Sequence, residues 1–501
     1  MKMNLRKVFA LLLCACLLLP ALASCAPVQS GGSVPSATPG GKTSAAPTGG
    51  GNAGAPELSG ELRIAALYNS SIEKLPWDFS KDYASLEELA YGFMMLHRNV
   101  TVRVDYELSR DYFDSHLNDE ERKARLDAFV QRVATGYQEG NGPDVVNVSG
   151  LDYYSLFEQE LFEDLYTYMD KDQTFRREEY FENIFTALEY YGGLYALPTA
   201  VSMKYVHLNR TITDALEIDT DEISAISGMQ LLEIYDRALA EGLVEAVFFG
   251  LGTSGRKSEP EEELYHYLDE RSREASFDSP EFLAYLEASQ RVRTSYIGGG
   301  LTSYEEEDLE HLKKHTNLFI QGNSLVSDLP DMLSEKFPHY RDAYTQAIPL
   351  SQGQQGKERT FTAPNMLGIT ESSENKELAW EFIKYCIAES TVVSYNGGRG
   401  WNGDRFIGHI PVNRNNLKKY LASAQKNWPI LPRVTPDEIT EGCAMLESWM
   451  EGINTAPSFF DLHSLEDILD DYYYCYYHYQ GLTAEECAKQ IQARVESYLA
   501  G

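Results

Sequence analysis

The sequence is poor in positive charge. Its 501 residues include 43 Lys and Arg against 76 Asp and Glu, which gives a formal net charge of −33. A field of that sign repels the phosphates of nucleic acids and anionic lipid head groups. We therefore expect no nucleic-acid partner, and a polyanionic ligand is disfavoured on the same ground.

Cysteine is also scarce, and its spacing excludes several kinds of site. Beyond the N-terminal 25 residues the chain holds four cysteines: Cys386, Cys443, Cys475 and Cys487. They form no Cys-x-x-Cys pair and show no metal-ligand spacing, so we expect no metal and no cofactor. In an exported protein these four could form two disulfides. Because Cys386 shares an apolar helical face with Phe382 and Ile383, we favour buried thiols instead.

Long hydrophobic runs are absent except at the N-terminus. Three basic residues there precede an apolar stretch over residues 8–19, which is short for a membrane span but typical of a secretory signal. The segment Leu22-Ala23-Ser24-Cys25 that follows resembles the lipobox of bacterial lipoproteins. This likeness implies that residues 1–24 are removed and that Cys25 is acylated, and two acyl chains suffice for stable attachment to a membrane. The simpler interpretation is a signal peptide with a chance cysteine near its cleavage site.

Residues 25–57 have the composition of a tether. Between Ala26 and Ala55 the chain is dominated by Gly, Ser, Ala, Pro and Thr, and Lys42 is its one charged residue. Such a segment cannot bury a core of its own. We expect it to connect a lipidated Cys25 to the folded part of the protein.

The first part of the folded region alternates strand and helix patterns. Strands are expected at 61–68, 100–107 and 142–149, and amphipathic helices at 85–97 and 119–137. A β-α-β-α-β order predicts a parallel sheet covered by helices. Because roughly 440 residues exceed what one core usually supports, two lobes are expected.

A chain reversal is predicted at Gly192-Gly193, between two apolar and aromatic runs, because a two-residue turn needs positive φ. Pro198 cannot donate into a ladder and should end a strand, while Val201 and Tyr205 favour a new strand just beyond it. We interpret 190–209 as a crossing from one lobe to the other.

Further along, the pattern predicts a helix around 230–235, a strand over 247–250, and helices over 277–296 and 304–317. The acidic run over 259–274 is interpreted as the solvated face of another helix.

Several segments resemble the extracellular solute-binding protein family 1, the maltose-binding type. They are the Gly-Pro-Asp-Val-Val strand at 142–146, the Asn-Lys-Glu-Leu-Ala-Trp-Glu-Phe-Ile-Lys-Tyr helix at 375–385, the Gly-His-Ile-Pro-Val crossing at 408–412 and the final helix at 481–499. The resemblance runs from about Glu61 to the end. It implies an α/β, two-lobe, type II periplasmic-binding-protein fold, each lobe a mixed or parallel sheet flanked by helices and joined by hinge crossings. We expect one lobe to comprise 58–203 and 366–412, and the other 204–365 and 413–501.

Candidate ligand-binding residues follow from the predicted sheet. In open α/β sheets the carboxyl ends of the strands face the crevice, which favours Asn69, Ser149, Asp152 and Tyr153. Aromatic side chains are common platforms for sugar rings, and the sequence holds 33 tyrosines. Those in predicted loops or at the crossing that we add to the site are Trp77, Tyr205, Tyr395 and Trp401. For each residue the alternative is an ordinary cap, loop or core role.

The sequence contains no HExxH, GxSxG or SxxK arrangement, so we expect a protein that is not an enzyme. The resemblance implies a monomeric, lipid-anchored receptor on the extracytoplasmic face of the cell membrane, which binds a mono- or oligosaccharide between its lobes and delivers it to the permease of an ABC importer. Two alternatives stay open. One is a lipid-anchored glycoside hydrolase, since its carboxylate pair has no fixed spacing. The other is a sensor or adhesin with no importer.

Overall fold

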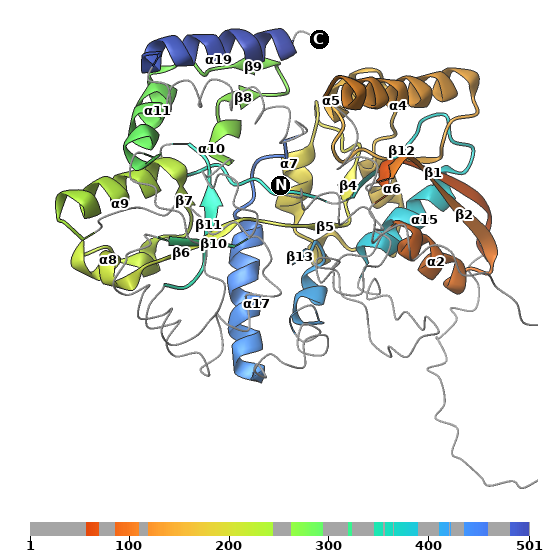
Figure 1. Ribbon diagram of the computed structural model, residues 1–501. Coiled ribbons are helices and arrows are strands. Elements are labelled where there is room, and N and C mark those ends of the chain that lie inside the picture. Colours follow the sequence, from red (N-terminus) through yellow and green to blue (C-terminus); the bar gives the residue numbers. More distant parts are fainter. Residues whose placement is uncertain are drawn as a thin grey trace, which may run out of the picture. The chain divides into compact units, whose positions relative to one another are not determined.

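The computed structural model describes a large part of the chain beyond residue 56 (Figure 1). The described residues are 57–69, 86–109, 119–243, 262–293, 319–322, 345–353, 356–363, 365–388, 410–419, 421, 435–458 and 481–499. The predicted signal, Cys25, the tether, and the elements expected at 247–250 and 304–317 lie outside these residues.

A five-stranded sheet organises the first part of the chain. In spatial order its strands are β2 (Asn99–Ser109), β1 (Ser59–Asn69), β3 (Val145–Asn147), β12 (Met366–Ile369) and β4 (Leu197–Pro198). β1 pairs in parallel with both β2 and β3, whereas β12 is antiparallel to β3 and β4. The predicted β-α-β-α-β unit is confirmed, and the later strands make the sheet mixed.

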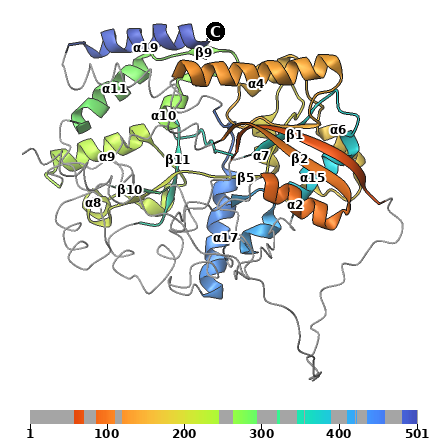
Figure 2. The same cartoon turned by 45° about the vertical axis from the view of Figure 1, so that its right-hand side comes forward.

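Helices cover both faces of this sheet. In Figures 1 and 2, α2 (Leu86–Leu96) and α15 (Lys376–Ile387) lie together on one face, and α4 (Asp119–Glu139) lies on the other. The Phe93 and Phe382 rings meet edge to face between α2 and α15, with centroids 5.4 Å apart. Opposite faces for α2 and α4 are expected, because right-handed crossovers that step in opposite directions from β1 and β2 place their helices on opposite sides.

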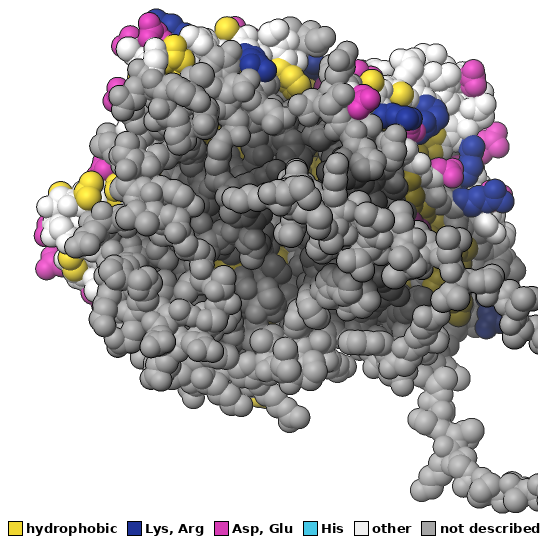
Figure 3. Space-filling model, viewed as in Figure 1, with side chains coloured by type: hydrophobic (Ala, Val, Ile, Leu, Met, Phe, Trp, Pro, Cys, Tyr) yellow, Lys and Arg dark blue, Asp and Glu magenta, His cyan; other side chains and the backbone are white. Residues whose placement is uncertain are grey.

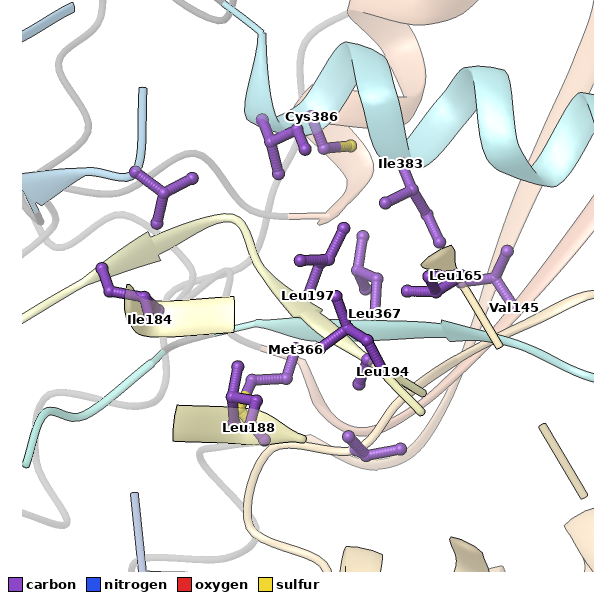
Figure 4. Close-up of a cluster of buried hydrophobic side chains, with 14 of the residues drawn as sticks. Val145, Leu165, Ile184, Leu188, Leu194, Leu197, Met366, Leu367, Ile383 and Cys386 are labelled. Carbon is purple, nitrogen blue, oxygen red and sulfur yellow. The ribbon is translucent and has the colours of Figure 1, made fainter. Parts of the chain in front are cut away.

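The core beneath α15 confirms its predicted apolar stripe. Leu378, Phe382, Ile383 and Cys386 are all buried. In Figure 4, Ile383 and Cys386 point from α15 toward the strands that carry Leu197 and Leu367. This face contributes to a large cluster of buried apolar side chains around the five-stranded sheet. We call the sheet, this cluster and the elements that pack on them the first lobe.

Several shorter elements complete the first lobe. They are α5 (Tyr153–Glu158), α6 (Tyr166–Lys171), η1 (Arg177–Glu179), α7 (Glu182–Leu188), β5 (Ala200–Val201), β13 (Ile410–Pro411) and η4 (Arg414–Asn416). β5 and β13 pair antiparallel with each other. Near the C-terminus, α17 (Pro436–Glu451) packs against α7 and contributes Leu446, Trp449 and Met450 to the same buried cluster.

A four-stranded sheet organises the second lobe, which we define by this sheet and its own buried cluster. In spatial order its strands are β10 (Phe319–Gly322), β6 (Tyr205–Leu208), β11 (Ile348–Ser351) and β7 (Ile226–Ser227). Its helices are α8 (Arg210–Ala215), η2 (Thr220–Glu222), α9 (Gly228–Ala240), α10 (Glu262–Tyr265), α11 (Pro280–Arg293) and α19 (Ala484–Leu499). The helices predicted around 230–235, over 277–296 and at the C-terminus are confirmed.

Side-chain hydrogen bonds to the backbone stabilise two helices of the second lobe, α9 and α19. Ser227 accepts from the Gln230 amide, and the Gln230 side chain accepts from the Ser227 amide in return, so α9 begins with a capping box. Farther along, the Gln492 side chain of α19 accepts from the Phe277 amide at 2.7 Å and donates to the Ala275 carbonyl at 2.8 Å. The last helix is thereby tied to a segment more than two hundred residues earlier.

The predicted reversal is a tight turn, but it lies one residue earlier than predicted: its central residues are Tyr191 and Gly192, not Gly192 and Gly193. Tyr190 and Gly193 exchange both backbone hydrogen bonds, at 2.9 and 3.1 Å, and Tyr191 and Gly192 have φ of 47° and 85°. Two central residues with positive φ define the hairpin turn that matches strand twist. After the turn the chain passes through β4 of the five-stranded sheet and through β5, which pairs with β13. It then enters the four-stranded sheet at β6, so it crosses from one lobe to the other as predicted.

Two other expectations have definite outcomes. The acidic run over 259–274 is not one helix: after the short α10 it forms a hairpin of β8 (Leu268–Asp269) and β9 (Glu274–Ala275), so that prediction was wrong. The many charged residues indicated that the segment is exposed to solvent, but they did not distinguish a helix from a hairpin. Among the described cysteines, Cys386 and Cys443 are free thiols, and the Cys386 and Cys487 side chains are buried.

Candidate functional site

The strand ends of the five-stranded sheet define a candidate site. Since β1, β3 and β4 run in the same direction and β12 runs against them, the ends of the first three meet the start of the fourth. The residues at this edge, which we call the carboxyl edge, are Asn69, Asn147, Ser149, Thr199 and Asn365. In open α/β folds such an edge is where ligands bind.

A buried amide pair anchors the carboxyl edge. The side chain of Asn147 donates to the Asn365 side-chain oxygen at 3.0 Å. Its own oxygen accepts from the backbone amides of Met366, at 2.9 Å, and Ser149, at 3.2 Å. Asn365 in turn accepts at its backbone oxygen from the Thr199 amide. Because buried amides are costly unless they are satisfied, this network fixes how β3 ends.

Sequence reasoning missed Asn147 and Asn365. The available signal was a single polar residue inside the apolar run Val145-Val146-Asn147-Val148, which marks a buried position with a partner. The partner lies 218 residues away along the chain, and nothing in the local sequence points to it.

Ser149 lies at the carboxyl edge as predicted. The residue is half-buried, and its hydroxyl oxygen is buried with no hydrogen-bond partner in the described part of the chain. A buried hydroxyl without a partner is destabilising by about 1–3 kcal/mol. A ligand oxygen placed beside it would remove that cost.

Asp152 follows Ser149 and caps α5. One carboxylate oxygen accepts from the Ser155 amide at 3.0 Å, and the other pairs with Arg273 of the second lobe at 2.9 Å. The predicted binding residue is therefore held by its own helix and by the opposite lobe together.

Tyr153 and Tyr205, by contrast, lie inside the protein. Tyr153 is 2% exposed, and its hydroxyl donates to the Pro457 carbonyl at 2.5 Å. Burial raises the pKa of this phenol well above its usual value. Tyr205 is fully buried in β6, with its ring centroid 5.6 Å from that of Trp449. Both rings join segments that are distant in the sequence.

The other predicted site residues are described only in part or not at all. For Asn69 the structure gives the backbone, as the end of β1 paired with Ser109. Trp77, Tyr395 and Trp401 lie outside the described residues. The structure thus brings together Ser149 and Asp152 with the newly found Asn147.

Paired segments cross between the lobes beside this edge. Ser202 and Thr362 exchange backbone hydrogen bonds at 2.8 and 2.9 Å, which couples the segment leading from β5 to β6 with the return to β12. The Thr360 hydroxyl donates to the Ala456 carbonyl, and Asn454 accepts at its side chain from the Arg359 amide, both at 2.9 Å. The chain after α17 therefore lies along the crossing.

Comparison with solved structures identifies this arrangement. The sugar-binding protein MalE from Xanthomonas citri aligns with a TM-score of 0.52 at 12% sequence identity, covering 88% of this chain and 98% of that one. An extracellular solute-binding protein of family 1 from Alicyclobacillus acidocaldarius aligns with a TM-score of 0.52 at 10% identity, covering 88% and 99%. The chain has the type II solute-binding-protein fold. No family model and no curated protein sequence matches it.

The predicted two-lobe, type II α/β fold is therefore confirmed, and so is the likeness of fold to the family named from the sequence motifs. Within the described residues, no group of three or more His, Cys, Asp or Glu side chains is placed to hold a metal ion. No helix in the described segments is long and apolar enough to cross a bilayer. On the face in Figure 3, the coloured surface mixes acidic and basic side chains with hydrophobic ones.

Proposed function

We propose that this protein is a lipid-anchored, extracytoplasmic solute-binding receptor that captures a carbohydrate and delivers it to an ABC importer. The observation that carries the proposal is the meeting of strand ends, crossing segments and second-lobe side chains at the carboxyl edge of a type II solute-binding fold. We assign 58–203 with 366–412 to the first lobe and 204–365 to the second. Of the stretch 413–501 that the sequence placed in the second lobe, η4 and α17 pack with the buried cluster of the first lobe, and α19 packs with that of the second.

A carbohydrate is the favoured solute for two reasons. The Xanthomonas citri protein of the same fold is a sugar-binding protein. This chain is also rich in tyrosine, and aromatic rings with polar edges stack on sugars while their hydroxyls form hydrogen bonds. The net charge of −33 further favours a neutral solute over an anionic one.

Capture follows from the two-lobe arrangement. A solute that contacts both lobes only when they are together has a higher affinity for that state, so it shifts the hinge equilibrium toward closure. Ser149 and Asp152 would contact the solute from the first lobe, with Asn69, Trp77, Tyr395 and Trp401 as further proposed contacts. The predicted contacts Tyr153 and Tyr205 are left out, because their side chains are buried in the protein. A permease can then distinguish loaded from empty receptor.

Membrane attachment rests on the N-terminal sequence. The charged start, the apolar run and Leu-Ala-Ser-Cys25 favour acylation of Cys25, with residues 26–57 as the tether. Expression of the full-length chain in a bacterium fed a tagged fatty acid tests this. The tag should appear on the wild-type protein and be lost from Cys25→Ser, while Cys443→Ser serves as the matched control.

Solute screening tests the receptor function. The mature protein is incubated with mono- and oligosaccharides, amino acids and peptides, while its melting temperature and the integrity of each compound are followed. A saccharide that raises the melting temperature and is recovered intact supports the receptor. Cleavage of a saccharide would support the glycoside hydrolase instead. If a saccharide stabilises the protein but the source bacterium has no importer permease genes, the sensor or adhesin would be favoured.

Trp401 offers a residue-level test once a saccharide has been found. Trp401→Ala should weaken its binding about tenfold or more, since an aromatic platform contributes on the order of 1–2 kcal/mol. The melting temperature of the unliganded protein should stay close to the wild-type value. A large fall in that temperature would assign the ring to the core.

A further inference from the structure

A charged turn of the second lobe reaches onto the first lobe. The turn joins β8 to β9 over residues 270–273, and its shape is fixed by Asp269, whose side chain accepts from the amides of Arg271 and Ser272 at 3.1 Å each. Arg273 adopts a positive φ of 57° at the end of the turn. The base of the hairpin is rooted in the second core, where Tyr267 packs against Phe277 and Phe282.

Arg273 makes the first point of contact. Its Nη2 lies 2.9 Å from the carboxylate of Asp152 and 2.9 Å from the hydroxyl of Ser155, at the start of α5. Its Nη1 donates to the Leu499 carbonyl of α19 at 3.4 Å. One guanidinium group thus joins the last helix of the second lobe to the helix that follows β3 in the first.

Arg271 makes the second point of contact, at the Tyr190–Gly193 turn. It donates to the Glu189 carbonyl at 2.5 Å. Its guanidinium carbon lies 5.2 Å from the Tyr190 ring centroid and 5.9 Å from that of Tyr191. The Tyr191 side chain is 85% exposed, so this cation–π contact lies at the surface.

We propose that Arg271 and Arg273 form a reversible latch that holds the two lobes in the described arrangement. The contacts are directional, charged and partly solvated: the Arg273 and Asp152 side chains are 41% and 31% exposed. Exposed ion pairs are weak and are screened by salt, whereas a buried apolar interface would hold the lobes permanently. The same turn also carries Glu270, whose carboxylate accepts from the Ser458 hydroxyl. Weak polar contacts of this kind on one turn can be broken and formed again.

The latch is also joined to the carboxyl edge. Arg273 pairs with the carboxylate that caps α5, three residues beyond Ser149. Separation of the lobes must release Asp152 from Arg273, so lobe movement changes the charge balance at the edge of the candidate site. This coupling requires no knowledge of the solute, and the latch does not depend on the proposed transport function.

The test measures the distance between the lobes. Spin labels are introduced as noncanonical residues at two exposed positions of the full mature chain, Gln131 of α4 and Asp214 of α8, which leaves the native thiols untouched. Distance distributions are recorded for the parent, for Arg271→Ala with Arg273→Ala, for Arg273→Lys, and for Arg103→Ala. The last variant is the matched control, since it removes an exposed ion pair with Glu61 inside the first lobe.

In the double variant the population with the parent interlobe distance, relative to the populations at other distances, should fall roughly tenfold. The reason is that an exposed ion pair, the Arg271 hydrogen bond to the Glu189 carbonyl and a cation–π contact are removed together. Arg273→Lys should have a smaller effect, and raising the salt should move the parent toward the double variant. Arg103→Ala should match the parent. Distributions that coincide for the parent and the double variant would overturn the latch, as would an equal change in Arg103→Ala. If the double variant does not fold, the salt series and Arg273→Lys decide the question in the same way.

Discussion

The two lobes are built on the same principle but stabilised in different ways. In the first lobe β1 and β2 pair in parallel from Ser59 and Asn99 to Asn69 and Ser109, and helices bury both faces of that long ladder. In the second lobe no strand of the described four-stranded sheet exceeds four residues. Its core depends on helices and on the Tyr267, Phe277, Phe282 and Tyr285 rings. A long pair of strands can lose a few hydrogen bonds and stay paired, whereas a sheet of short strands depends on the side chains that pack against it.

The largest expected effects come from removing one ring from each core. Phe382→Ala in the first lobe and Phe282→Ala in the second should each lower the free energy of unfolding by about 3–5 kcal/mol, because both side chains are fully buried. Urea unfolding followed by circular dichroism measures the loss. Tyr191→Ala, at an exposed ring, should change it by less than about 0.5 kcal/mol. Similar losses for all three variants would contradict the assignment of the two cores.

Acid should weaken the second lobe first, through His207 in β6. Burial lowers the pKa of this imidazole to about 4, although its hydrogen bond with the Thr345 carbonyl acts in the opposite direction. Between pH 6.5 and 4 the unfolded chain binds the proton and the folded chain does not, so stability is lost as the pH falls through that window. The loss should be about 3 kcal/mol.

The check on His207 is unfolding at several pH values. The slope of stability against pH between 6.5 and 4 should be reduced in His207→Gln, whatever its absolute stability. An unchanged slope would show that other groups control acid sensitivity in this range.

The first lobe should respond to acid at lower pH, through Asp172. Burial alone would raise the pKa of this carboxyl, but hydrogen bonds from Lys384, Thr174 and Trp380 outweigh it and hold the pKa well below its ordinary value of 3.8. The stabilisation is complete above that value and is lost as the pH falls below it.

Lys384→Met removes the charged partner of Asp172 and should destabilise the protein by about 2 kcal/mol at pH 7. Urea unfolding at about pH 7 and about pH 3 gives the free energy of unfolding of the parent and of the variant. The difference between these two free energies should shrink at the lower pH. Lys376→Met, which removes a neighbouring pair with Glu163, is the matched control. A difference that grows on acidification would show that the pKa of Asp172 is not lowered by its partners.

A smaller effect than those of the Phe382, His207 and Asp172 tests is expected at the start of α15. The Ser373 hydroxyl accepts from the Asn375 amide at 3.0 Å and donates to the Asp144 carboxylate at 2.6 Å. Ser373→Ala should destabilise the first lobe by about 1 kcal/mol, which is typical of a lost hydrogen bond. Ser373→Thr should recover most of the loss in thermal unfolding; failure to do so would show that the hydroxyl is not what stabilises the helix start.

The sequence predicted best where one element carries its own pattern. The parallel strands, α15 with its buried stripe and the Tyr190–Gly193 turn follow from local periodicity and glycine chemistry. Features that join distant segments were not predictable. Asn147 meets Asn365, and Arg273 meets Asp152, because the fold places them together, and no local spacing encodes such pairs.

The candidate site shows the same limit. Ser149 and Asp152 were predicted to lie near the carboxyl edge because the ends of parallel strands meet at one edge of an α/β sheet. Tyr153 follows them directly, yet its side chain turns inward to the Pro457 carbonyl. Residue type and chain position could not distinguish a ring at the edge from a ring in the core, since both suit an amphipathic phenol.

Small-angle X-ray scattering of the mature protein, recorded with and without the saccharide that raises its melting temperature, tests the central claim most directly. The account predicts a smaller radius of gyration at saturation, because the solute holds the lobes together, and full recovery of the intact saccharide afterwards. A scattering curve unchanged by every stabilising compound, or release of cleaved sugar, would contradict it.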